Sequence, residues 1–173
     1  MTWDGILTAV HAWQVRPSDV RESALRKRWL SRLPAEERIE YERFRTHETR
    51  TNYLFARVLC RTTLSKYADT DPSEWRFGKA LHGKPIVVGP GRFKSLRFSL
   101  SHTNDLIICA VTRAGEVGVD AEDTSLPVDV GLVARHFFSG PEKTRLARLP
   151  GQQRVRRFFE QFVLKEAYVK ATG

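Results

Sequence analysis

The chain is poor in cysteine. Only Cys60 and Cys109 occur among its 173 residues, far apart in the sequence and each among apolar neighbours. Two such residues cannot supply a framework of several disulfides or the cysteine spacing of a zinc site. We therefore expect two buried thiols, which suits a protein of the reducing cytoplasm.

Long apolar runs are also absent. No stretch of the sequence approaches the roughly 20 apolar residues of a membrane-spanning helix. Residues 1–5 do not form a basic region leading into an apolar one, so we expect no signal peptide. The sequence has no internal repeat and no low-complexity segment. We expect a globular protein, either one domain or two small halves that share a core, with no membrane partner.

Acidic residues are outnumbered, with 20 Asp and Glu against 29 Lys and Arg and a net charge of +9. Such a balance favours an anionic partner: a nucleic acid, a phosphorylated cofactor or an acidic protein. The charge alone does not choose among these classes. The sequence contains no basic-aromatic nucleic-acid motif and no zinc-finger spacing, which makes nucleic acid the weaker interpretation.

Hydrophobic periodicity predicts an α+β protein. The predicted strands are residues 10–15, 75–78, 85–88, 96–101, 106–112 and 117–121, and the predicted helices are residues 48–67, 129–138 and 155–172, with a further helix start at Pro34. The strands within residues 96–122 should form an antiparallel meander.

Two carboxylates stand on one face of the predicted strand at residues 117–122. Residues two apart in a strand point the same way, which places Asp120 and Glu122 together. Gly118 on that face lets a bulky neighbour approach the backbone. Mg²⁺ prefers oxygen ligands and often uses one or two carboxylates plus substrate phosphates. The alternative is a strand that simply ends in the polar turn at residues 123–125.

A third carboxylate lies on the apolar arc of the predicted helix at residues 155–172. At about 100° per residue, Glu166 falls in the middle of that arc. A carboxylate there is costly to bury unless it is paired or bound to a metal. An ion pair with Lys170 at i+4 is the alternative, but it does not explain the position on the apolar arc. We favour a site in which Glu166 joins Asp120 and Glu122.

Arginines repeat along one stripe of the predicted helix at residues 48–67. Arg50, Arg57 and Arg61 are spaced i, i+7 and i+11. The guanidinium group presents a fixed fork that suits phosphate oxygens. The stripe is therefore either a row that faces phosphate or a solvated basic face.

Four motifs together resemble the 4′-phosphopantetheinyl transferase family, of the type that includes the surfactin-synthetase activators. The motifs are Gly-Lys-Pro at 83–85, Phe-Ser-Leu-Ser-His-Thr at 98–103, Gly-Val-Asp-Ala-Glu at 118–122 and Phe-Val-Leu-Lys-Glu-Ala-Tyr-Val-Lys at 162–170. Their order and spacing fit the family over most of the chain, and the last two in combination are specific. Phe162 stands where many members have Trp, and Thr103 where many have Ser.

The resemblance implies a fold of two similar halves, each a small antiparallel sheet with a long helix, packed around a shared cleft. The halves would be residues 1–112 and residues 113–173. In the family pattern the second half continues beyond the helix that carries Glu166. We therefore expect this half to be incomplete, which would leave Phe158, Phe159 and Phe162 partly uncovered.

The resemblance also implies an activity. Such enzymes transfer the 4′-phosphopantetheine arm of coenzyme A to a serine of an apo carrier protein and release 3′,5′-ADP. The expected partners are coenzyme A and an acidic carrier helix, with Mg²⁺ as the metal. A basic nucleic-acid-binding domain and an inactive coenzyme-binding relative remain alternatives. The sequence does not say which carrier is used.

Residue roles carry over from the resemblance one by one. Asp120, Glu122 and Glu166 would hold Mg²⁺ against the coenzyme diphosphate. The remaining residues would contact the coenzyme: Lys170 and Lys165 near its phosphates, Lys84 near the adenosine end, and Ser101, His102 and Arg57 around the 3′-phosphate. Catalysis would fall to Glu166 and Lys170. Glu166 is the first candidate for accepting the serine proton, and a water at the metal is the second.

Overall fold

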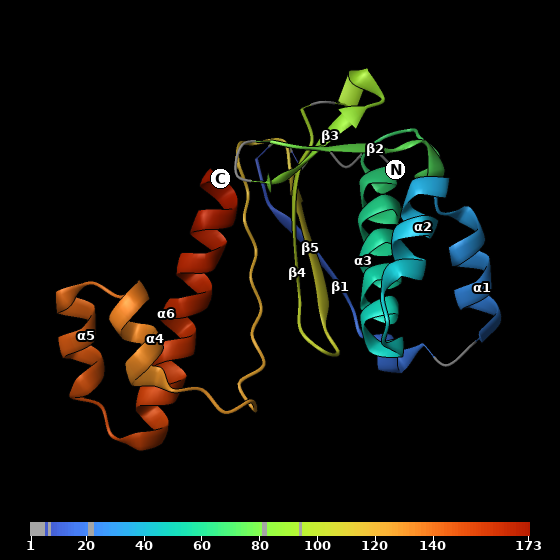
Figure 1. Cartoon of the computed structure of the whole chain (residues 1–173). Helices are drawn as coiled ribbons and strands as arrows, with labels where there is room; N and C mark the ends of the chain where they lie inside the picture. The colour runs from blue at the N-terminus through green and yellow to red at the C-terminus, as the bar shows by residue number, and fades with distance from the viewer. Residues whose placement is uncertain (1–5, 7, 21–22, 81–82, 94) are drawn as a thin grey trace.

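A computed structural model describes residue 6 and residues 8–20, 23–80, 83–93 and 95–173. The chain is an α+β protein, as the sequence predicts (Figure 1). Three helices lie on one side of a small sheet, and a second group of three helices lies on the other side. An extended segment, residues 113–129, runs between the sheet and the second group of helices. None of the described helices is long and apolar enough to cross a bilayer.

The central sheet has the strand order β1-β5-β4, with both pairs antiparallel. Its strands are β1 His11–Val15, β4 Arg97–His102 and β5 Ile107–Thr112. The central strand β5 is almost entirely buried, which explains its near-continuous apolar sequence. A separate two-stranded ribbon pairs β2 Arg76–Lys79 with β3 Pro85–Gly89. All five strands match predicted ones.

The long helix α3, His47–Lys66, packs on one face of this sheet. The Thr46 hydroxyl caps its first turn by accepting the Thr49 N–H, which fixes where the helix begins. Two shorter helices, α1 Ser23–Arg32 and α2 Ala35–Arg43, pack against it. Short 3₁₀ turns occupy Pro17–Asp19, Pro72–Glu74 and Gly91–Phe93.

A buried core joins α3 to the sheet and includes both cysteines. Cys60 of α3 and Cys109 of β5 are each fully buried free thiols, as expected. A hydrogen bond with Cys60, together with burial, raises the pKa of the Cys109 thiol well above its ordinary value. Both thiols therefore behave as apolar core groups.

The second group of helices comprises α4 Val130–Phe137, α5 Gly140–Ala147 and α6 Gly151–Thr172. Side chains define where the first two begin. Asp129 accepts the Leu132 N–H at the start of α4, and Ser139 and Glu142 form a capping box at the start of α5. Helix α6 begins directly after Pro150, four residues before the predicted start, since Pro is tolerated at a helix N-terminus.

This group of helices has its own buried core, separate from the one under the sheet. Phe158 and Phe159 of α6 are 1% and 8% exposed, because Ala134, Phe138 and Leu146 of the shorter helices pack on them. The expectation that these two phenylalanines would be partly uncovered is therefore wrong, and only Phe162 is half-buried. Toward the end of α6 the apolar arc is left open, with Val169 56% exposed.

The predicted strand at residues 117–121 is wrong. Residues 113–173, all of which the structure describes, contain no strand. The segment is extended and runs beside β4, but its N–H groups bond to serine side chains instead of strand carbonyls. The predicted meander therefore ends after β5.

Candidate active site

Two serines of β4 hold the extended segment in place. The Ser99 Oγ accepts the Val119 N–H at 3.1 Å, and the Ser101 Oγ accepts the Ala121 N–H at 3.2 Å. Ser99 and Ser101 are two apart in the strand, so both point to the same face, away from α3. The two hydroxyls fix the residue between their partners, Asp120.

Gly118 lets α6 approach this segment closely. A Cβ at this position would lie 1.8 Å from the Ala167 carbonyl oxygen and 2.7 Å from the Ala171 nitrogen. No side chain fits that space. The predicted close approach at Gly118 is thus confirmed, and the neighbour is the backbone of the helix that carries Glu166 and Lys170.

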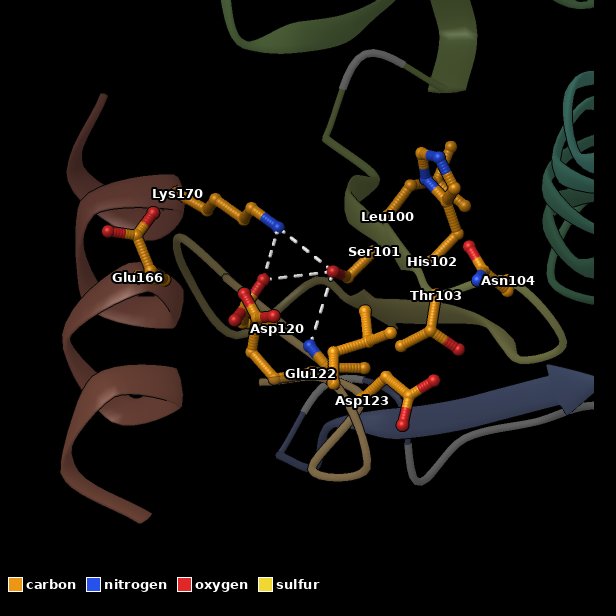
Figure 2. A pocket seen from close by; sticks show the side chains of 12 residues that line it. Leu100, Ser101, His102, Thr103, Asn104, Asp120, Glu122, Asp123, Glu166 and Lys170 are labelled. Atoms are coloured by element: carbon orange, nitrogen blue, oxygen red, sulfur yellow. Dashed lines mark hydrogen bonds and ion pairs between the residues drawn. The ribbon is translucent and has the colours of Figure 1, made fainter. Parts of the chain in front are cut away.

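Asp120 and Lys170 form an ion pair at the meeting point of the segment, α6 and β4 (Figure 2). The Lys170 Nζ donates to Asp120 Oδ1 at 2.6 Å and to the Ser101 Oγ at 3.0 Å, and the Ser101 hydroxyl donates to the same Oδ1 at 2.9 Å. The Asp120 side chain is only 5% exposed. A buried carboxylate needs such compensation to stay charged.

The second oxygen of Asp120 is buried and has no hydrogen-bond partner. Such an atom is costly to leave unsatisfied, because it has lost its water without gaining a donor. Glu122 and Glu166 line the same cavity of about 490 Å³ as Asp120. Burial, and then the nearby carboxylates of Asp120 and Glu166, raise the pKa of Glu122, while Lys170 opposes the rise. Glu122 is therefore close enough to both other carboxylates to interact with them electrostatically.

These groups suit a hard divalent cation. They offer only oxygen donors, and one of those oxygens, Asp120 Oδ2, is buried and unpaired. Across the described ranges, no three His, Cys, Asp or Glu side chains form a ready-made metal cluster. Mg²⁺ does not require one, since one or two carboxylates and the phosphates of a substrate can complete its shell.

A second cavity, of about 600 Å³, adjoins the first. Leu100 and His102 line both. The second cavity is basic and aromatic, with Arg57 and Lys79 beside Tyr53 and Phe77. Together the two cavities place a carboxylate-rich end next to a cationic, ring-lined end.

A third, apolar cavity of about 880 Å³ lies along α6. Val155, Phe159 and Val163 line it, and Glu122 lies at its boundary with the carboxylate cavity. An apolar surface therefore adjoins the carboxylate cavity at Glu122.

Two of the lysines assigned to the coenzyme make other contacts in the structure. The Lys84 Nζ donates to Glu116 Oε2 at 2.6 Å and to the Ala171 carbonyl oxygen at the end of α6. The Lys165 Nζ pairs with Glu142 of α5 at 3.0 Å and lies 5.6 Å from the centre of the Phe138 ring. Neither lines the two polar cavities. Their coenzyme contacts remain predictions, while Lys84 here joins the two parts of the chain.

The arginine stripe divides into three different environments. Arg50 donates to the carbonyls of Phe44 and Glu42, and Arg61 is 4% exposed and bonded within the fold. Arg57 alone of the three lines the basic cavity. Neither a continuous phosphate row nor a solvated face describes the stripe, because its members lie at different depths against α2 and β2.

Sequence reasoning did not find several residues of the basic cavity. Phe44 directly follows α2, Asn52 and Tyr53 lie on α3, and Lys79 ends β2, so only folding brings them together. One local signal was present: Tyr53 precedes Arg57 by four residues, so the two side chains are neighbours on α3. In the structure the Arg57 guanidinium lies 5.1 Å from the centre of the Tyr53 ring.

The sequence matches known families over nearly its whole length. Residues 16–114 match the family described as 4′-phosphopantetheinyl transferase, N-terminal, and residues 116–173 match the 4′-phosphopantetheinyl transferase superfamily. The first match alone covers more than half of the chain. The chain therefore belongs to the 4′-phosphopantetheinyl transferase superfamily, as its motifs indicate.

Curated relatives agree with this assignment. The chain is 34% identical to the 4′-phosphopantetheinyl transferase HetI of Nostoc sp., over 95% of this chain and 68% of the relative. It is 31% identical to a putative 4′-phosphopantetheinyl transferase of Synechocystis sp., over 82% of this chain and 57% of the relative. A phosphopantetheinyl transferase of Thraustochytrium sp. is 32% identical, over 95% and 61%. The chain thus spans roughly three fifths to two thirds of the length of these relatives.

Proposed function

We propose that this protein transfers the 4′-phosphopantetheine arm of coenzyme A to a serine of an apo carrier protein, with release of 3′,5′-ADP. The observation that carries this proposal is the environment of Asp120. Asp120 has a buried, unpaired oxygen, and it lines a cavity with two further carboxylates and a lysine, directly beside a basic cavity. A ligand with a diphosphate and a separate phosphate monoester fits this charge pattern.

The coenzyme would lie across both cavities. Its diphosphate would occupy the carboxylate cavity near Lys170, and its 3′-phosphate would reach the basic cavity with Arg57. His102 lines both cavities, so it would sit between these two groups. Arginine suits the monoester because its fork matches phosphate oxygens.

Asp120, Glu122 and Glu166 would hold Mg²⁺, which supplies positive charge to the diphosphate and to the departing oxygen. Lys170 would add a second positive charge close to the same phosphates. The Ser101 hydroxyl orients both Asp120 and Lys170, since it bonds to each. The protein's main contribution would be position and charge, as is usual in phosphoryl-type transfer.

The transfer itself exchanges one phosphorus–oxygen bond for another. The carrier serine oxygen bonds to the phosphorus that bears the pantetheine arm, and the bond from that phosphorus to the ADP oxygen breaks. Glu166 would accept the serine proton, since its carboxylate lines the cavity where the serine must enter. The carrier would approach along the apolar cavity of α6, which adjoins the carboxylates at Glu122.

A transfer assay tests this proposal. The purified chain is incubated with an apo acyl carrier protein and coenzyme A labelled in the pantetheine arm, with Mg²⁺ or with EDTA. We expect the intact mass of the carrier to rise by one phosphopantetheine only when Mg²⁺ is present. Coenzyme binding without transfer would point to an inactive relative, and salt-sensitive retention on DNA without either would favour the nucleic-acid interpretation.

A further inference from the structure

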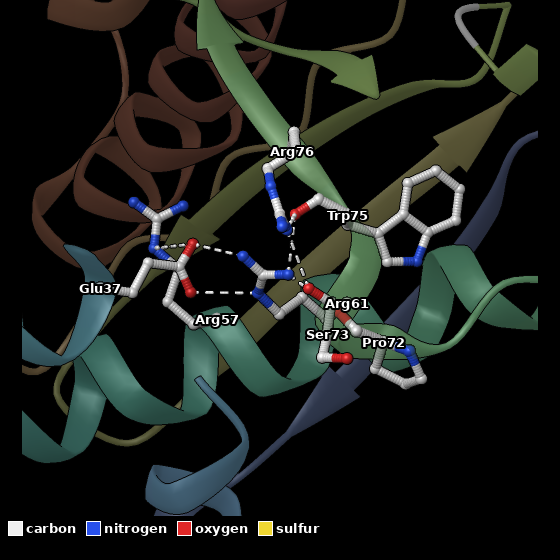
Figure 3. Close-up of polar contacts among 7 residues, drawn as sticks. All are labelled: Glu37, Arg57, Arg61, Pro72, Ser73, Trp75 and Arg76. Carbon is white, nitrogen blue, oxygen red and sulfur yellow. Dashed lines mark hydrogen bonds and ion pairs between the residues drawn. The ribbon is translucent and has the colours of Figure 1, made fainter. Parts of the chain in front are cut away.

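Glu37 of α2 contacts two arginines of α3 that have different surroundings (Figure 3). Its carboxylate receives the Arg61 fork in bidentate fashion, with Nη2 at 2.9 Å from Oε1 and Nε at 3.0 Å from Oε2. The Nε of Arg57 lies 3.7 Å from the same Oε1. The Glu37 side chain is only 14% exposed, so these contacts are partly shielded from water.

Arg61 is fixed on every side. Its Nη1 donates to the carbonyl oxygens of Pro72 at 2.8 Å and Trp75 at 3.0 Å, and its guanidinium lies 5.1 Å from the centre of the Phe77 ring. A buried guanidinium with this many acceptors has one available orientation. Arg61 therefore acts as a rigid mount for the Glu37 carboxylate.

Arg57 contacts the same Glu37 carboxylate but is more exposed to solvent than Arg61. Its side chain is 29% exposed and lines the basic cavity, with its guanidinium over the Tyr53 ring. The Glu37 charge is already balanced by the bidentate Arg61 pair. The positive charge of Arg57 thus remains available for a ligand, while the shared carboxylate oxygen limits where the guanidinium can turn.

We propose that Glu37 is a positioning residue that aims Arg57 at a phosphate monoester in the basic cavity. This inference rests on the proposed function, in which that monoester is the 3′-phosphate of coenzyme A. Recognition of phosphate by arginine depends on the orientation of the fork as well as on charge. Without Glu37, the Arg57 side chain would keep its contacts with Tyr53 but lose part of that orientation.

The test compares Glu37→Gln with Glu40→Gln. Gln keeps the size of the side chain and removes its charge. Glu40 lies on the same helix, and its carboxylate pairs with Arg43 at 3.0 Å and does not line the basic cavity. Calorimetry gives the dissociation constants for coenzyme A and for dephospho-coenzyme A, and their ratio is the readout. A purely structural role would change both constants together and leave the ratio unchanged.

We expect Glu37→Gln to reduce the preference for coenzyme A over dephospho-coenzyme A by about tenfold, the equivalent of one charge-assisted hydrogen bond. Glu40→Gln should keep the wild-type ratio. Arg57→Gln leaves the buried Glu37–Arg61 pair intact and should reduce the preference for coenzyme A by a similar factor. The double variant Arg57→Gln with Glu37→Gln should have the same ratio as Arg57→Gln alone.

An unchanged ratio in Glu37→Gln overturns the proposal. An increased ratio also does so, because it would mean that Glu37 only removes positive charge from the cavity. If Glu37→Gln does not fold, the test rests on Arg57→Gln. A wild-type preference for coenzyme A over dephospho-coenzyme A in that variant also overturns the proposal. If the wild type transfers phosphopantetheine but the variants do not show the expected ratios, this inference is wrong and the proposed function stands. If the wild type binds no coenzyme, both are wrong.

Discussion

Asp120 shows how much a single side chain can depend on its neighbours. Its carboxylate is almost wholly buried, and a lysine and a serine hydroxyl both bond to one of its oxygens. The other oxygen has no partner. A buried carboxylate with one unpaired oxygen contributes little to the stability of the fold, whereas it can serve as a ligand for a cation.

Replacement of the carboxylates should therefore reduce activity more than stability. We expect Asp120→Asn and Glu166→Gln each to lower the rate of phosphopantetheine transfer by at least about 100-fold, since each removes a charged group from a site that works by charge. The rate is measured by the mass shift of the carrier, and folding by circular dichroism.

Glu160→Gln is the matched control. Glu160 also lies on α6, but its carboxylate pairs with Arg156 and Arg157 and lines the apolar cavity instead of the carboxylate cavity. At saturating carrier concentration it should keep the wild-type rate. Full activity in either Asp120→Asn or Glu166→Gln would remove the metal-site hypothesis.

At this scale the sequence predicts residue types better than contacts. It places Asp120, Glu122, Glu166 and Lys170 around the metal and the diphosphate, and the structure brings all four to one cavity. Ser101, which was expected near the 3′-phosphate, lines this cavity too and does not line the basic one. The sequence could not foresee that Lys84 bonds to Glu116 and to the end of α6, because that contact joins segments 87 residues apart. Periodicity reports the face of an element and carries no information on which other element will cover it.

Among the elements, α6 is positioned by a glycine. At position 118 only glycine, which has no Cβ, allows the Ala167 carbonyl to come so close. The same helix carries Glu166 and Lys170, so its distance from the extended segment sets the geometry of the site.

Gly118→Ala should consequently affect both stability and activity. The added methyl group must push α6 away, at a cost of about 1–3 kcal/mol for overpacking, and should separate Lys170 from Asp120. Urea denaturation and the transfer assay measure the two effects. Gly140→Ala at the start of α5 is the control, since an added Cβ there meets no atom within 4 Å. Equal behaviour of the two variants would contradict the close-packing argument.

Helix α5 depends on the charge of its capping residue. The Ser139 backbone N–H, and then Lys165, lower the pKa of Glu142 from its ordinary value of 4.5 to about 2. Because the folded pKa is lower than the unfolded one, the charged form stabilises the protein above pH 4.5, and that contribution is lost as the pH falls toward 2.

We therefore expect the wild type to be more stable than Glu142→Gln at pH 7, with a difference that narrows between pH 4.5 and pH 2. Urea denaturation of both proteins across this range measures it. A difference that stays constant with pH would mean that hydrogen bonding alone, which Gln can also provide, accounts for the cap.

The elements themselves were largely predictable. Strands β1 to β5 and helices α3 and α6 follow the apolar period of the sequence within a few residues. The exception is the segment at residues 117–122, whose alternating pattern is that of a strand. It has no ladder because Ser99 and Ser101 take its N–H groups, and a pattern of apolar residues does not reveal such side-chain acceptors.

For the whole molecule, the net charge of +9 favours an acidic carrier. Exposed charges are screened beyond roughly 10 Å at 0.1 M salt, whereas groups enclosed in a cavity are screened less. We expect the apparent affinity for the carrier to fall with added salt more steeply than the affinity for coenzyme A. Steady-state kinetics at several salt concentrations measures both, with coenzyme A as the internal reference. A carrier affinity that does not change with salt would exclude electrostatic docking.

The two serine hydroxyls of β4 have a consequence for how this site can change over evolution. In an ordinary sheet the register of a strand is held by backbone N–H and C=O groups, which every amino acid except proline provides in full. Here two side chains, Ser99 and Ser101, fix the position of Asp120 along β4 by accepting the N–H groups on either side of it. Substitution of either serine can therefore shift or release the Asp120 carboxylate without any change to Asp120 itself.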